Sequence, residues 1–108
     1  MSVKKLIKQL LGKYEGNEKL PELRQDQVMN IIESVFEDYE LKSGSHIKIT
    51  DSRIKNYWEL TKDRDLGPDG SLCIPVKKGQ KVRAVYIKDL VKFIKVIRMM
   101  EGKSEEQD

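Results

Sequence analysis

The sequence predicts an α+β fold: a three-stranded antiparallel sheet with two helices on one face, in the order α-β-β-β-α, plus an extra N-terminal helix. Apolar residues recur at helical spacing near both ends of the chain, whereas in the middle they alternate as in a strand. A chain of 108 residues has the usual size of one domain. We expect a helical extension at 1–20, the domain at 21–102 with an insertion at about 51–70, and a disordered acidic tail at 103–108.

The first helix is predicted to begin after Ser2, whose hydroxyl can cap it, and to end at Gly12. Four apolar residues form a stripe along it that needs a packing partner: Leu6, Ile7, Leu10 and Leu11.

The second helix is expected at about 21–38, with Pro21 in its first turn, where the missing N–H of proline costs no hydrogen bond. Its apolar face has the full helical spacing and consists of Val28, Ile31, Ile32, Val35 and Phe36.

Two short strands joined by a tight turn are predicted next. Tyr39 and Leu41 alternate with polar residues before the turn at Ser43-Gly44, and Ile47 and Ile49 alternate with polar residues after it.

The insertion at 51–70 mixes aromatic and charged residues and ends in the turn signal Gly67-Pro68-Asp69-Gly70. Residues 53–60 can form a helical turn, and we expect Tyr57 and Trp58 to pack the insertion onto the sheet rather than to stack on bases.

The third strand is predicted at Leu72 to Val76. Pro75 places it at an edge of the sheet, because proline cannot donate to a β-ladder. The last helix is expected at about 85–101, with an apolar face formed by Ile87, Leu90, Val91, Ile94 and Ile97.

The net charge of +3 hides an uneven distribution. Residues 21–41 carry six acidic side chains against one arginine, whereas residues 77–103 carry nine Lys or Arg against two acidic side chains. A basic segment of this kind suits a polyanion such as nucleic acid, although a solvated lysine-rich face explains the same pattern.

Several classes of site and location are disfavoured by composition. With one His and one Cys the chain forms neither an internal disulfide nor, alone, a His/Cys zinc site, and we expect no metal and no cofactor. Cys73, between Leu72 and Ile74, is expected to be a buried, inert thiol. No apolar run approaches the roughly 20 residues of a membrane span, and no secretory signal pattern is recognisable. We expect a cytoplasmic protein without membrane contact.

The turn Gly44-Ser45-His46, which enters the second strand, is the best candidate for chemistry. The stretch 37–49 reads EDYELKSGSHIKI, follows an amphipathic helix and precedes the strand Leu72-Cys73-Ile74-Pro75-Val76. In these features the chain resembles the HicA family of toxin ribonucleases, over roughly 24–50 and 71–98. The resemblance implies a fold like that of double-stranded-RNA-binding domains, a catalytic role for His46, and a HicB-like antitoxin that covers the face carrying His46.

A histidine at this position also makes chemical sense. Metal-free RNA cleavage needs a base that removes the 2′-hydroxyl proton while that oxygen attacks phosphorus, and imidazole in general titrates near pH 6.5, about the right range. Gly44 and Ser45 would shape the turn and offer backbone N–H groups. The side chains expected to bind RNA phosphate are Lys42, Lys48, Lys77 and Lys78.

Together with these residues, the resemblance implies a small endoribonuclease that acts on mRNA, an mRNA interferase. Two alternatives stay open. One is a non-catalytic RNA- or DNA-binding module of the same fold. The other is a protein-interaction domain in which the stripe of the first helix docks a partner or a second copy of the chain.

Overall fold

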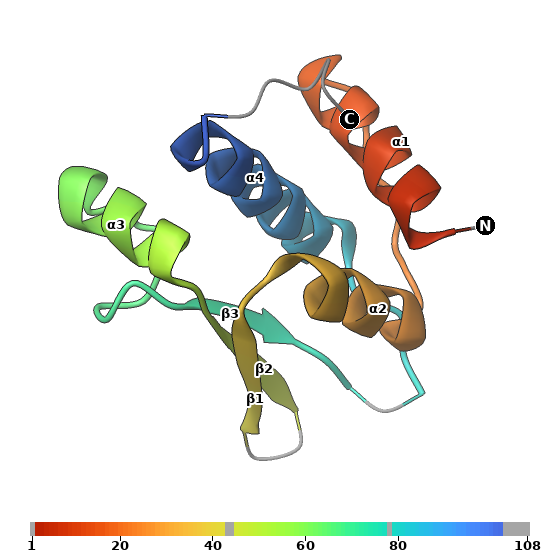
Figure 1. Ribbon diagram of the computed structural model, residues 1–108. Helices are drawn as coiled ribbons and strands as arrows, with labels where there is room; N and C mark the ends of the chain where they lie inside the picture. Colours follow the sequence, from red (N-terminus) through yellow and green to blue (C-terminus); the bar gives the residue numbers. More distant parts are fainter. Residues whose placement is uncertain (1, 43–44, 78, 103–108) are drawn as a thin grey trace.

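The computed structural model describes residues 2–42, 45–77 and 79–102, and it confirms the α+β class. Four helices and three strands lie within these residues, in the order α1, α2, β1, β2, α3, β3, α4. Helices α2 and α4 lie on one side of the sheet, and α1 lies beyond them (Figure 1). The predicted order is therefore present as α2-β1-β2-β3-α4, extended by α1 and α3. No helix in the described part of the chain is long and apolar enough to cross a membrane.

Helix α1 (Val3–Glu15) begins as predicted, because the Ser2 hydroxyl accepts a hydrogen bond of 3.2 Å from the Lys5 N–H. The predicted end at Gly12 is wrong, since the helix continues to a cap at Gly16. A glycine inside a helix costs only about 1 kcal/mol, and Tyr14 in the added turn packs against the core. The apolar stripe is buried or partly buried against α2 and α4, so this chain itself covers it.

Helix α2 (Gln25–Val35) is shorter than predicted at both ends. Pro21 does not lie in its first turn, because the chain first forms an isolated antiparallel bridge between Leu23 and Val82. The Leu23 N–H donates to the Val82 carbonyl at 3.2 Å, and the Val82 N–H donates in return at 2.7 Å. The helix begins only after this bridge, and its buried residues are those of the predicted apolar face: Val28, Ile31 and Ile32.

The sheet has the order β1-β2-β3, with all strands antiparallel: β1 (Asp38–Lys42), β2 (His46–Thr50) and β3 (Leu72–Pro75). Pro75 thus lies on an edge strand, as predicted. Alternate residues are fully buried on the face toward the helices, among them Ile47, Ile49 and Ile74. No helix of the described residues lies on the opposite face, and the predicted turn at Ser43-Gly44 lies outside those residues.

The segment 51–70, where the sequence indicates only a helical turn, contains the ten-residue helix α3 (Ser52–Thr61). Its Tyr57 ring meets the Phe93 ring edge-on, with centroids 6.1 Å apart. Tyr57 therefore packs α3 onto α4, where packing onto the sheet was expected. Gly70 lies under Trp58 with a φ of +77°, a conformation that favours glycine, so the turn after α3 can approach the indole closely.

Helix α4 (Ala84–Met100) forms the centre of the core, close to its predicted bounds. Its buried side chains contact the sheet, α1 and α3. They are Ile87, Leu90, Val91, Phe93, Ile94, Val96 and Ile97.

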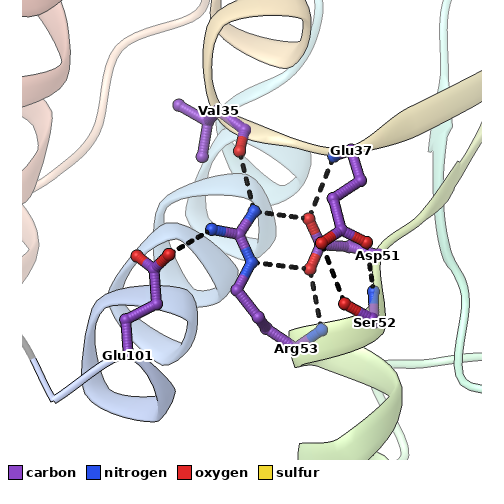
Figure 2. Close-up of polar contacts among 6 residues, drawn as sticks. All are labelled: Val35, Glu37, Asp51, Ser52, Arg53 and Glu101. Atoms are coloured by element: carbon purple, nitrogen blue, oxygen red, sulfur yellow. Dashed lines mark hydrogen bonds and ion pairs between the residues drawn. The ribbon is translucent and has the colours of Figure 1, made fainter.

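A buried carboxylate joins the elements that meet at one end of the molecule (Figure 2). Asp51 is 1% exposed, and it accepts hydrogen bonds from the backbone N–H groups of Glu37 at 3.0 Å and Arg53 at 2.9 Å. The Arg53 guanidinium donates to the same carboxylate at 2.7 and 3.0 Å. It also donates to the Val35 carbonyl at 3.0 Å and to Glu101 at 2.7 Å. One arginine thereby connects the ends of α2 and α4 to the start of α3.

Burial by itself raises the pKa of the Asp51 carboxyl, but the hydrogen bonds from Arg53 and from the two backbone N–H groups outweigh it and lower the pKa below its usual value. Asp51 is therefore ionised and fully bonded, as a structural group should be. Among the described residues, no buried polar side-chain atom lacks a hydrogen-bond partner.

Candidate functional site

The candidate site lies on the sheet face that no helix covers. In β2 the side chains of Ile47 and Ile49 point into the core, so His46 and Lys48 point the other way. The register pairs His46 with Lys42 on one side and with Pro75 on the other. We call this surface the open face; it carries Asp38, Glu40, Lys42, His46, Lys48, Thr50, Cys73 and Pro75.

His46 is exposed at the first position of β2. Its Nδ1 lies 3.1 Å from the Ser45 Oγ, and either atom can donate, depending on the imidazole tautomer. When Nδ1–H donates to Ser45, the lone pair of Nε2 is free to accept a proton. The backbone just before His46 is held at Ser45, because the Ser45 N–H donates to the Lys42 carbonyl at 3.2 Å and the Val76 N–H donates to the Ser45 carbonyl at 2.8 Å. Gly44 lies outside the described residues.

Lys48, a predicted phosphate ligand, forms an ion pair of 2.7 Å with Asp69. The hydrogen bond from Lys48, helped by one from Ser71, lowers the pKa of Asp69, and the same bond raises the pKa of Lys48. Asp69 belongs to the turn that the sequence analysis treated only as a chain reversal. Lys48 is thus on the expected face, beside His46, with its charge matched by a carboxylate.

The other predicted lysines lie in different surroundings. Lys42 is opposite His46 and forms an exposed ion pair of 3.1 Å with Glu40, a contact worth little in water. Lys77 is exposed just beyond β3. Lys78 lies outside the described residues.

A basic pocket that the sequence analysis did not single out adjoins this site. It has a volume of about 240 Å³ and lies between the end of β3 and the start of α4. We call it the 75–86 pocket; its lining residues are Pro75, Lys77, Gln80, Lys81, Val82, Arg83 and Tyr86. The sequence signal for this pocket is the run of basic residues after the third strand, of which only Lys77 and Lys78 are predicted phosphate ligands.

Cys73 is exposed, so the prediction of a buried thiol is wrong. It lies in β3 directly opposite Lys48, on the open face, whereas its neighbours Leu72 and Ile74 point into the core. The error has a simple cause, because a strand covered on one side alone exposes every second residue whatever the neighbours are.

The donor groups of the described residues include no cluster of three or more His, Cys, Asp or Glu side chains that could hold a metal ion. Comparisons of the chain with protein-family models, with curated proteins and with solved structures give no match. The resemblance to HicA therefore stays a prediction, and a functional proposal has to rest on the residues of the open face and of the 75–86 pocket.

Proposed function

We propose that the protein is a small RNA-binding ribonuclease of the HicA type that uses His46 as general base. The observation that carries the proposal is the position of His46, exposed on the open face, beside Lys42 and next to the 75–86 pocket. A base of this kind needs access to the 2′-hydroxyl of RNA and cations near the phosphate, and this arrangement offers both.

The reaction would run through Nε2 of His46. With Nδ1–H held by Ser45 Oγ, Nε2 takes the 2′-hydroxyl proton while the 2′-oxygen attacks the adjacent phosphorus. The bond from phosphorus to the 5′-oxygen breaks, and that oxygen takes a proton from water. The hydroxide left behind takes the proton from Nε2, which restores the neutral imidazole. The products are a 2′,3′-cyclic phosphate and a free 5′-hydroxyl. Nearby cations such as Lys42 and Lys77 stabilise the negative charge that grows on the phosphate oxygens.

The test compares cleavage of a labelled single-stranded RNA by the wild-type protein and by His46→Ala, in the presence of EDTA. We expect the variant to be slower by about 100-fold or more, the usual contribution of a general base. Thr50→Ala is the matched control, because Thr50 is exposed on the same face at the other end of β2. The products should end in a cyclic phosphate. Equal rates for wild type and His46→Ala would show that His46 is not the base.

A non-catalytic RNA-binding module of the same fold is the outcome if the wild-type protein binds RNA without cutting it. The 75–86 pocket supports this second candidate as well as the first, since the cations among its described lining residues serve binding whether or not His46 acts as a base.

The proposal includes a partner and a place of action. A toxic ribonuclease acting on mRNA in the cytoplasm needs a HicB-like antitoxin that covers the open face. Expression in bacteria should arrest growth with the wild-type chain but not with His46→Ala, and co-expression of a small neighbouring open reading frame should restore growth. Growth arrest by both proteins would contradict the toxin mechanism.

A further inference from the structure

The 75–86 pocket begins on β3, the strand that pairs with the start of β2 at His46. Pro75, which lines the pocket, is the register partner of His46, and directly opposed residues of an antiparallel pair lie only about 4.5–5.5 Å apart between Cα atoms. A strand of RNA with one phosphate at His46 therefore brings its next nucleotide to the pocket.

The charge of the pocket suits a phosphate. The described residues of its lining include the cations Lys77, Lys81 and Arg83 and no carboxylate. Within the described residues, none of the ion pairs involves these three side chains, whereas Lys42 and Lys48 on the open face are both paired with carboxylates. An anionic group entering this pocket thus meets positive charge that nearby acidic residues have not already neutralised.

The remaining lining suits a base. Tyr86 is half-buried and Pro75 lies on the strand side, so an aromatic ring and an apolar ring border the same space. Aromatic side chains stack on unpaired bases irrespective of base identity. The Gln80 amide offers one acceptor and two donor hydrogens for a base edge. A volume of about 240 Å³ is below the range of roughly 300–1,000 Å³ that encloses a drug-sized ligand, which limits the pocket to a single nucleotide.

We infer that the 75–86 pocket binds one unpaired nucleotide of an RNA strand whose neighbouring phosphate lies at His46. The inference rests on the proposed function, since it names the substrate as single-stranded RNA and gives its direction of approach. The phosphate of the nucleotide in the pocket contacts Lys81 and Arg83, and its base contacts Tyr86.

The test measures binding of a fluorescein-labelled 2′-O-methyl RNA 12-mer of mixed sequence, about the length a small domain can span, because a 2′-O-methyl strand cannot be cleaved through its 2′-oxygen. The variant Lys81→Gln/Arg83→Gln removes two pocket cations. Arg83 precedes α4 without a side-chain cap hydrogen bond, so its loss does not uncap the helix. The matched control Lys4→Gln/Lys8→Gln removes two exposed lysines from α1, on the far side of α2 and α4 from the sheet (Figure 1).

We expect the pocket variant to bind about tenfold more weakly. The slope of log K against log salt should fall by about 0.7, because the two cations contact one phosphate and each phosphate neutralised on a single strand contributes about 0.7. The control should change binding by less than about threefold. Tyr86→Leu should weaken binding about fivefold or more without changing the slope, since stacking involves no counterion release. Urea unfolding checks that each variant is folded.

Three results would count against the inference. Equal weakening by the pocket and control variants would mean that only overall charge matters. If folded Tyr86→Leu binds RNA with unchanged affinity, the base does not contact Tyr86. In both cases RNA binding by the wild-type protein, and with it the proposed function, would survive. Absence of binding by the wild-type protein would instead refute the proposed function and the inference together.

Discussion

The Asp51 carboxylate provides the sharpest test of what holds this fold together. Asp51→Ala removes the cap of α3, a loss that typically costs about 1 kcal/mol. It also leaves Arg53 without its carboxylate, and breaking a buried ion pair costs about 3–5 kcal/mol. The Arg53 side chain is 23% exposed and keeps its bonds to Glu101 and Val35, which places the loss at the lower end of that range.

We therefore expect Asp51→Ala to lower the free energy of unfolding by about 3 kcal/mol, not the sum of the two contributions, because both involve the same carboxylate. A domain of 108 residues is stable by about 5–15 kcal/mol, so this loss is a large part of the total. Urea unfolding followed by circular dichroism should show the midpoint lower by about 1–3 M with little change in slope.

Asp26→Ala is the matched control. Asp26 also pairs with an arginine two residues away, Arg24, at 3.1 Å, but both side chains are more than half exposed. An exposed pair of this kind contributes little, because water solvates and screens both charges. If Asp51→Ala destabilises the protein no more than Asp26→Ala does, the buried carboxylate does not hold these elements together and the reasoning is refuted.

Three further predictions concern acid stability, the core and the thiol. The pKa of Asp51 is lower in the folded chain than in the unfolded one, so its contribution to stability is present above about pH 4 and is lost as the pH falls through the folded-state pKa. The urea midpoint should therefore drop more steeply between pH 5 and pH 2 in the wild-type protein than in Asp51→Asn. Phe93→Ala should cost about 3–5 kcal/mol in urea unfolding, since Phe93 is fully buried, whereas Leu41→Ala, at a residue 58% exposed, should change stability by about 0.5 kcal/mol or less. In the native protein Cys73 should react with a thiol reagent at a rate within about tenfold of its rate in urea. A native rate several orders of magnitude below the rate in urea would contradict the exposure of Cys73.

The elements of the sheet and the last helix could be predicted because each rests on a local pattern. Ile47 and Ile49 alternate with polar residues, and Pro75 restricts its strand to an edge, whatever the rest of the chain does. The start of α2 was predicted wrongly because it depends on a distant partner. Leu23 is held by Val82, and no local pattern around Pro21 contains that information.

The helix α3 was underestimated for a related reason. It buries only Ile54 completely and leaves the apolar Leu60 79% exposed, so the buried helical stripe is narrow. Its stability comes from contacts that the sequence does not display, namely the Tyr57 ring against Phe93 and the cap by Asp51, which is itself held by Arg53. Where tertiary contacts supply most of the stability of a helix, the spacing of its apolar residues alone does not predict its full length.

The candidate site could be predicted in its position but not in its charges. The turn before β2 directs attention to His46, and alternation places Lys48 beside it. Composition cannot say which lysines are already matched by a carboxylate. A phosphate that approaches Lys48 meets a charge already matched by Asp69 at 2.7 Å, whereas a phosphate that enters the 75–86 pocket meets no carboxylate among the described lining residues. Under the proposed function, this difference in unmatched positive charge favours a strand that runs from His46 toward the start of α4 over one that runs along β2 toward Thr50.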